Sequence, residues 1–190
     1  MNNAHRLKAL VDTGKTVFSV HDMRGLWGTA PSAARIAVSR METKGLLRRV
    51  ARGYYSLRMD YDPLELANLV VRPSYVSLQA ALFFHGLSSQ VRSSVESAAL
   101  YNYERKIDGR TFRYFAMKES LFFHMEGITA SKNVTIARPE RAVLDCLYFG
   151  LLPGLDRPES LNGRLVEKLA AAYPKTVRNK AEAFFGKSQP

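Results

Sequence analysis

Hydrophobic positions near the start of the chain recur at helical spacing and predict two short helices. The first is expected over 4–13, with an apolar side formed by Leu7, Leu10 and Val11. The second is expected to begin at a Ser19 cap, with Asp22 as a weak capping-box partner. It runs to about residue 27, and its buried side is expected to hold Val20, Met23 and, in part, Leu26 and Trp27. The residues placed to end these two helices are Gly14 and Gly28.

A third helix, predicted over 31–44 after a turn that contains Thr29, has two different sides. At about 100° per residue, one side is a narrow apolar stripe made by Ala34, Ala37, Val38 and Met41. The other side carries Ser32, Ile36, Ser39 and Thr43, with Arg35 and Arg40 at its edges. Small buried residues let such a helix pack closely on the helix before it. Hydroxyl and guanidinium groups on the outside suit base edges and phosphates. Gly45 is placed to end the helix.

Two β-prone runs, 46–50 and 54–57, flank a tight turn at Arg52-Gly53 and predict a hairpin. A helix–turn–helix followed by a basic hairpin is the winged helix–turn–helix, so residues 1–58 are expected to be a DNA-binding domain. The third helix would enter the major groove, and the hairpin, or wing, would lie along the backbone or the neighbouring minor groove. A winged helix that serves only protein contacts is the alternative.

The residues expected to contact DNA share a hydroxyl or guanidinium group and a place on the turn, the third helix or the wing: Thr29, Ser32, Arg35, Ser39, Arg40, Thr43, Arg48, Arg49 and Arg52. Base edges are expected for Arg35, Ser39 and Ser32. Phosphates are expected for Arg48, Arg49 and Arg52, of which Arg52, at the tip, is also suited to a minor groove.

The distribution of charge supports a polyanionic partner. The chain has 28 Lys and Arg against 17 Asp and Glu, a net charge of +11 and a pI near 9.9. Eleven of the basic and three of the acidic residues lie within 1–58, so most of the excess belongs to the first third of the chain. No apolar run approaches the roughly 18 residues of a membrane span. The start of the chain has no signal-peptide pattern either. We therefore expect no membrane partner and a cytoplasmic, nucleoid-associated location.

After a short linker at 60–63, the remaining pattern predicts a mixed α/β domain over 59–190. Helices are expected over 74–85, from Pro139, and over 159–172 and 175–185, with a loop at 150–158. Strands are expected over 95–103, 111–117, 121–125 and 134–137, with Asp108-Gly109 as a hairpin turn. The whole chain is therefore expected to be α+β, a winged helix–turn–helix followed by a mixed α/β domain.

The second part shows little catalytic chemistry. His5, His21, His85 and His124 lack the spacing of metal ligands, and the single cysteine, Cys146, is expected in the core. His85, at a helix end, is expected to cap or pack, with a pocket role as the alternative. Asp145 is expected to cap or to pair with Arg141. The Phe83-Phe84 and Phe122-Phe123 pairs are expected in the core. No nucleophile elbow, phosphate-binding glycine loop or paired-carboxylate pattern is present, so we expect no cofactor, no metal and no enzymatic activity.

Three stretches together resemble the AbiEi family, the antitoxins of type IV toxin–antitoxin systems. Residues 39–55 (Ser-Arg-Met-Glu-Thr-Lys-Gly-Leu-Leu-Arg-Arg-Val-Ala-Arg-Gly-Tyr-Tyr) resemble the family's recognition helix and wing. Residues 75–87 (Tyr-Val-Ser-Leu-Gln-Ala-Ala-Leu-Phe-Phe-His-Gly-Leu) resemble the helix that opens its second domain. Residues 138–145 (Arg-Pro-Glu-Arg-Ala-Val-Leu-Asp) resemble its Thr-Pro-Glu-(Lys/Arg)-Ala-x-x-Asp helix start. Arg138 departs from the usual threonine, which removes a capping hydroxyl, and the tail after Pro153 is short for the family.

The resemblance implies a repressor that binds inverted repeats in double-stranded operator DNA upstream of its own operon. It also implies a second domain that neutralises a co-encoded nucleotidyltransferase-like toxin, functionally rather than through a stable complex. Two other functions stay open from the residues alone. One is a stand-alone regulator whose second domain senses a ligand or dimerises. The other is a DNA-modifying or nuclease enzyme with an amino-terminal targeting module, which the missing carboxylate constellation disfavours.

Overall fold

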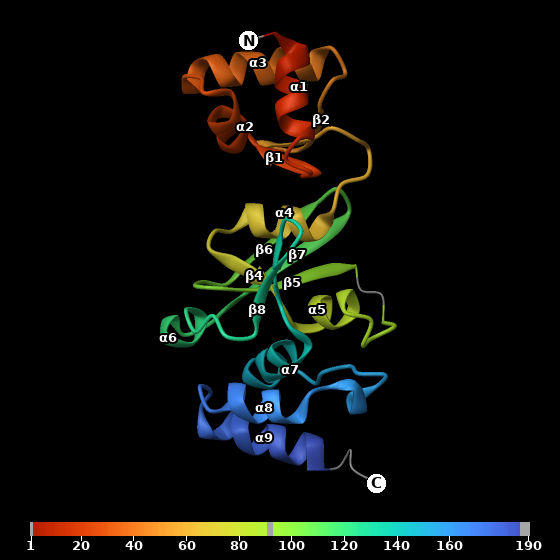
Figure 1. Ribbon diagram of the computed structural model, residues 1–190, viewed down its shortest axis with the longest axis vertical. Helices are drawn as coiled ribbons and strands as arrows, with labels where there is room; N and C mark the ends of the chain where they lie inside the picture. Colours follow the sequence, from red (N-terminus) through yellow and green to blue (C-terminus); the bar gives the residue numbers. More distant parts are fainter. Residues whose placement is uncertain (1, 91–92, 187–190) are drawn as a thin grey trace.

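In the computed structural model, which describes residues 2–90 and 93–186, three layers follow one another along the long axis (Figure 1). Three helices on a small sheet form one end, and a larger sheet lies in the middle. The other end is formed by the helices α7 (Pro139–Tyr148), α8 (Gly163–Ala170) and α9 (Lys175–Gly186). We call residues 2–58 the N-terminal unit and residues 59–186 the body. The chain is α+β, as its sequence predicts.

The N-terminal unit follows the expected order of elements. Its helices are α1 (Asn3–Val11), α2 (Val20–Trp27) and α3 (Pro31–Thr43), and its strands are β1 (Val17–Ser19), β2 (Arg48–Ala51) and β3 (Tyr54–Ser56). The strands form an antiparallel sheet in the order β1-β3-β2. The capping box at Ser19 forms as predicted, and Gly28 and Gly45 end α2 and α3 with positive φ angles of 57° and 67°.

A separate small core holds this unit together. Leu10, Phe18, Met23, Trp27 and Met41 are all buried in it. Two residues expected there are exposed instead, Val11 at 61% and Leu26 at 41%. Val11 is the last residue of α1, and Leu26 is the last but one of α2. The apolar stripe of these helices is therefore narrower than the sequence pattern suggests.

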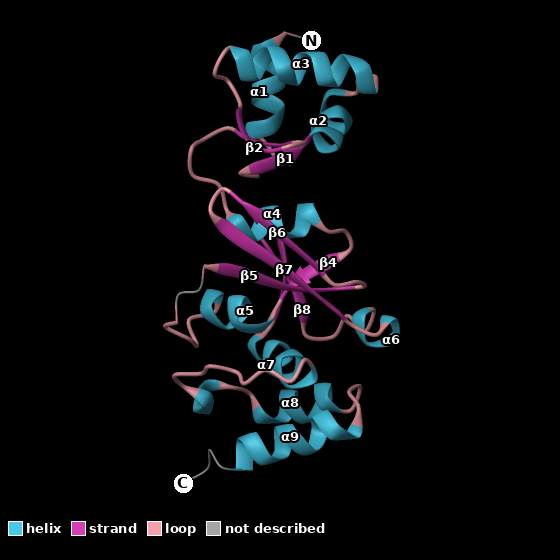
Figure 2. Ribbon diagram, turned by 180° about the vertical axis from the view of Figure 1, so that it is seen from behind, coloured by secondary structure: helices cyan, strands magenta, loops and turns pink. Residues whose placement is uncertain are grey.

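The body is built on a mixed sheet. Within the described residues its strand order is β6-β7-β5-β4-β9-β8, from β4 (Ser74–Val76), β5 (Ser94–Ala99), β6 (Tyr103–Ile107), β7 (Arg110–Ala116), β8 (Ile128–Ser131) and β9 (Val134–Ala137). Its helices are α4 (Pro63–Val70), α5 (Leu78–Phe84), α6 (Glu119–Phe122), α7 (Pro139–Tyr148), α8 (Gly163–Ala170) and α9 (Lys175–Gly186), with a 3-10 turn at Pro158–Ser160. Figure 2 shows the strands in the middle of the molecule and α7, α8 and α9 stacked beyond them.

Four predictions for the body are wrong, each because strand pairing or local turns outweigh the linear pattern. Residues 74–76 form a central strand rather than the start of a helix, and α5 begins only at Leu78, which has a φ of 53°. Residues 119–122 are a helical turn, not part of a strand. The segment 95–103 is divided between β5 and β6, and β8 was not predicted. The helix expected from 159 begins at Gly163.

A buried polar network ties the helices of the body to its sheet. Arg141 and Asp145 on α7 are fully buried, with the Arg141 Nε 3.3 Å from an Asp145 carboxylate oxygen, as the sequence predicts. Asp145 also accepts hydrogen bonds from Tyr75, Ser77 and Tyr173, on β4, before α5 and before α9. Charges buried this deeply are tolerated only when each is paired and hydrogen-bonded, so α7 has one fixed orientation.

The remaining core expectations are met in part. Cys146 is buried, and His85, at the end of α5, contacts the Ala137 carbonyl through Nε2 at 2.9 Å. Phe122 is buried, but Phe123, Phe83 and Phe84 are 53%, 46% and 42% exposed. In the part of the chain that the structure describes, we find no helix with the length and apolar character that crossing a membrane requires.

Candidate nucleic-acid interface

The outer side of α3 is an uninterrupted exposed surface. Its buried stripe is made by Ala34, Ala37, Val38 and Met41, each at most 4% exposed, as predicted from the helical period. The expected outer residues are all exposed: Ser32, Arg35, Ile36, Ser39, Arg40 and Thr43. None of the ion pairs among the described residues involves Arg35 or Arg40. Both guanidinium groups are therefore available to a phosphate or a base.

This surface lies at the tip of the molecule. α3 lies across this end of the molecule, beside the start of α1, in both views, and the body lies on the opposite side of the small sheet (Figures 1 and 2). Thr43 donates its hydroxyl hydrogen to the Ser39 carbonyl at 3.0 Å, so its oxygen is left as an acceptor. Nothing from the body covers the expected base-reading side chains.

The start of α3 has the features of an anion site. Its N-cap is Ala30, which has no polar side chain, and Pro31 occupies the first turn. The amino-terminal N–H groups of a helix that are not capped by a side chain are well placed to bind a phosphate. Ser32, at the same end, can add a hydroxyl contact. Thr29 behaves differently, because its hydroxyl oxygen is buried and has no hydrogen-bond partner among the described residues. Thr29 is half-buried, with its hydroxyl oxygen turned inward, away from the exposed side of α3.

The hairpin divides its three arginines between two surfaces. Arg49 and Arg52 are exposed, and Arg52 stands at the two-residue turn with Gly53, whose φ is 89°. Arg48 faces the body instead. It donates to the Met59 carbonyl at 2.9 Å and forms an ion pair with Asp108 at 2.9 Å. Arg48 therefore joins the two parts of the molecule, and only Arg49 and Arg52 remain on the free side of the hairpin.

The face of the small sheet that points away from its three helices is covered by the body, and this contact fixes the hairpin in place. Val50, Ala51 and Tyr54 pack against the core of the body, and the Tyr54 hydroxyl donates to the Leu69 carbonyl at 3.3 Å. β1 contributes Val17 to that same core. Because one face of the hairpin packs against the body, its exposed edge has a fixed position at which a ligand can bind.

Two of the three acidic side chains of the N-terminal unit, Asp12 and Asp22, are paired with basic groups. Asp12 is paired with Lys8 at 2.6 Å, and Asp22 lies 3.3 Å from Arg72. Burial raises the pKa of Asp22, but hydrogen bonds from Ser19 and the charge of Arg72 outweigh this effect and hold the pKa below its ordinary value. Asp22 is thus ionised at neutral pH, with its charge directed toward the junction rather than toward α3.

The titratable groups form no metal centre in the described part of the chain. No three His, Cys, Asp or Glu side chains lie close enough together there to hold a metal ion. Comparisons with known proteins add no relative, since no family model matches the chain and no curated protein matches it either.

Proposed function

We propose that the N-terminal unit is a winged helix–turn–helix that binds double-stranded DNA, and that the protein is a transcriptional repressor of its own operon. The observation that carries the proposal is the outer side of α3. Four buried apolar residues face inward on this helix, while hydroxyls and two arginines without ion-pair partners in the described chain face outward. A helix of this kind at the tip of the molecule is shaped to enter a major groove.

The contacts follow from the place of each side chain. Arg35, Ser39 and Ser32 are proposed to read base edges, and Ile36 between them is suited to a thymine methyl group. Arg40 and Thr43 are proposed to flank these contacts toward the carboxyl end of α3. The free wing residues, Arg49 and Arg52, are proposed to bind phosphates, which positions the protein but carries little sequence information.

Binding to the protein's own promoter tests this proposal. Affinity for promoter DNA and for a scrambled duplex of equal length is measured across a salt series, since phosphate contacts make affinity strongly dependent on salt. We expect tight, promoter-selective binding. Arg35→Ala should cost roughly 1–3 kcal/mol on the promoter and reduce selectivity, because it removes a base contact. Arg49→Ala should weaken both duplexes alike and lower the salt slope by about one.

Arg178→Ala is the matched control, because it removes the same charge from an exposed position on α9, at the other end of the molecule. It should leave promoter affinity near that of the parent. Equal, weak binding of the parent protein to both duplexes would contradict the proposal. Equal losses in Arg35→Ala and Arg178→Ala would show that net charge, rather than the surface of α3, drives binding.

For the body we propose the antitoxin role that its resemblance to the AbiEi family implies. The three matching stretches support it. The body would neutralise a co-encoded nucleotidyltransferase-like toxin without forming a stable complex. Co-expression is the test: the neighbouring gene should be toxic alone and harmless with this protein present. If this protein does not relieve the toxicity, the proposed antitoxin role is wrong, while the proposed DNA binding is unaffected.

A specific observation favours the second candidate, a stand-alone regulator that senses a ligand. The body has a cavity of about 380 Å³ lined mainly by apolar side chains, directly after the linker from the N-terminal unit. Pockets of this size and character are typical small-molecule sites. A genome neighbourhood without a toxin gene would favour this function over the antitoxin role.

A further inference from the structure

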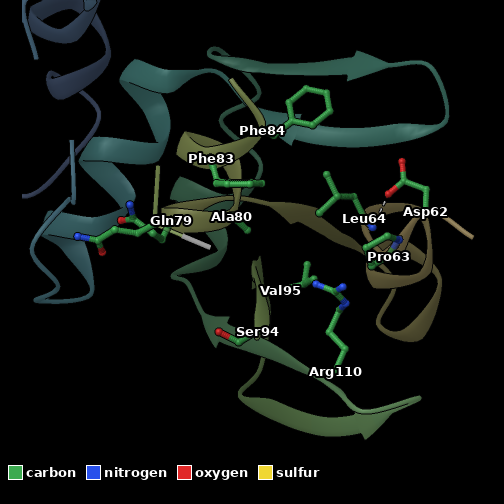
Figure 3. A pocket seen from close by; sticks show the side chains of 11 residues that line it. Asp62, Pro63, Leu64, Gln79, Ala80, Phe83, Phe84, Ser94, Val95 and Arg110 are labelled. Carbon is green, nitrogen blue, oxygen red and sulfur yellow. Dashed lines mark hydrogen bonds between the residues drawn. The ribbon is translucent and has the colours of Figure 1, made fainter. Parts of the chain in front are cut away.

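The cavity lies where four segments of the body meet. Figure 3 shows it between the start of α4, the helix α5 and the first residues of β5 and β7. Its apolar walls are formed by Pro63, Leu64, Ala80, Phe83, Phe84 and Val95. The two phenylalanines are almost half exposed, whereas Phe112 and Phe122 of the same domain are buried. Large aromatic side chains left open around a concave surface are typical of a binding site rather than of a core.

Some of the polar groups around the cavity already have hydrogen-bond partners within the protein, whereas others are free to bind a ligand. The amide of Gln79 is fully used, since it donates to Ser88 and to the Gly154 carbonyl and accepts from the Gly154 N–H. Asp62 accepts from the Leu64 N–H, as the cap of α4. Figure 3 shows this bond as a dashed line at the start of α4.

Arg110 is the charged group that the cavity offers to a ligand. It is the first residue of β7, it is exposed, and its guanidinium lies beside Val95 in Figure 3. The ion pairs among the described residues do not include it. Arg113, on the same strand, is instead paired with Glu104 at 2.7 Å. A free guanidinium beside an apolar wall favours an anion that also has an apolar part.

We propose that this cavity binds a small organic anion, with a planar apolar body held between Phe83, Leu64 and Val95 and one acidic group on Arg110. The volume of about 380 Å³ lies within the range of known ligand pockets. The apolar body would supply most of the affinity through burial, and the acidic group would select the orientation. This binding does not depend on whether the N-terminal unit recognises DNA.

Two fluorescent probes of nearly the same shape test the proposal. 8-Anilinonaphthalene-1-sulfonate carries an acidic group, and N-phenyl-1-naphthylamine has the same aromatic body without it. Titrating the full-length protein should give saturable binding of both probes at one site, with the sulfonate bound more tightly. Arg110→Gln should weaken the sulfonate about tenfold or more and leave the neutral probe unchanged. Arg113→Gln, the matched control on the same strand, should change neither.

Filling the cavity gives an independent test. Ala80→Phe places a larger side chain on the inner side of α5 and should remove both probes, with circular dichroism confirming the fold. Arg110→Gln changes an exposed residue and needs no core to adapt, so it tests the proposal even if Ala80→Phe fails to fold. Sulfonate binding that survives Arg110→Gln unchanged overturns the assigned anion contact. Probe binding that survives in a folded Ala80→Phe protein overturns the cavity as the site.

Discussion

Arg138 precedes the first turn of α7, at a position where short polar side chains usually cap the helix. It is the N-cap of α7, with φ and ψ of −64° and 160°, and its side chain makes no capping hydrogen bond to the described helix. Threonine, serine or aspartate at this position would accept a hydrogen bond from the first turn. The helix keeps its start because Pro139 presets the backbone and because Arg141 and Asp145 are held in the core.

Replacing Arg138 by threonine should therefore stabilise the protein. The backbone is already in the conformation of an N-cap, and the residue is exposed, so the new hydroxyl meets no obstacle. The expected gain in the free energy of unfolding is about 1 kcal/mol, or about 2–4 °C in Tm for a chain of this size. Chemical denaturation of the two proteins checks this. A matched Arg138→Ala variant removes the same side chain without adding a hydroxyl, and equal stability of the two variants would contradict the capping explanation.

Arg48 and Thr29 show that the orientation of a single side chain at the candidate interface is harder to predict than the side of an element that is exposed. Both occupy the expected element, and both were expected on DNA. The partner of Arg48, Asp108, is 60 residues away in sequence and reaches it only after the body folds against the hairpin. The orientation of Thr29 depends on how the turn before α3 packs. Neither fact has a signal within the local pattern of the chain.

At the scale of elements, the sequence is most informative where the signals are local. The helices and hairpin of the N-terminal unit begin and end at capping residues and glycines, which act through neighbouring residues. The side of α3 that is exposed follows from a period of 3.6 residues alone. For the same reason the Asp108-Gly109 turn and the start of α7 at Pro139 were predicted correctly.

The body is less predictable because its sheet is assembled from distant segments. β4 pairs with β5 on one side and β9 on the other, so residues 74–76 become a strand despite a helical pattern. Pairing energy between strands outweighs the weak local preference of three residues. The cavity was missed for a related reason. Its walls come from four segments, and no single stretch carries a recognisable motif.

At the scale of the whole molecule, the junction between the N-terminal unit and the body is specific rather than a flexible tether. Glu65 on α4 is buried and accepts hydrogen bonds from the Thr16 backbone N–H and hydroxyl at 2.7 and 2.9 Å. The ion pairs Arg72–Asp22 and Arg48–Asp108 lie at the same junction. Val17 belongs to the core of the body although it is part of the N-terminal sheet. These contacts should make the two parts unfold together.

The single tryptophan allows this to be measured. Trp27 lies in the small N-terminal core, so its fluorescence reports on that unit, while far-ultraviolet circular dichroism reports on all helices. In urea, both signals of the parent protein should have the same midpoint. Glu65→Ala leaves the partly buried Thr16 N–H without its acceptor and should lower the free energy of unfolding reported by both signals by about 1–3 kcal/mol.

Glu167→Ala, at an exposed position on α8, is the control for removing a carboxylate and should have little effect. Two separate midpoints in the parent protein would show that the N-terminal unit unfolds independently. A shift confined to the tryptophan signal in Glu65→Ala would show the same.

One short segment links the cavity to the N-terminal unit, whose outer surface we propose to bind DNA. The backbone N–H of Asp62 donates to the Thr16 hydroxyl at 2.8 Å, and Asp62, Pro63 and Leu64 also form a wall of the cavity. Thermodynamic linkage makes any influence between two binding sites reciprocal. If an anion in the cavity changes the affinity for the operator by some factor, the operator changes the affinity for the anion by the same factor. Operator DNA would then regulate anion binding by the body, in addition to being the site at which the repressor acts.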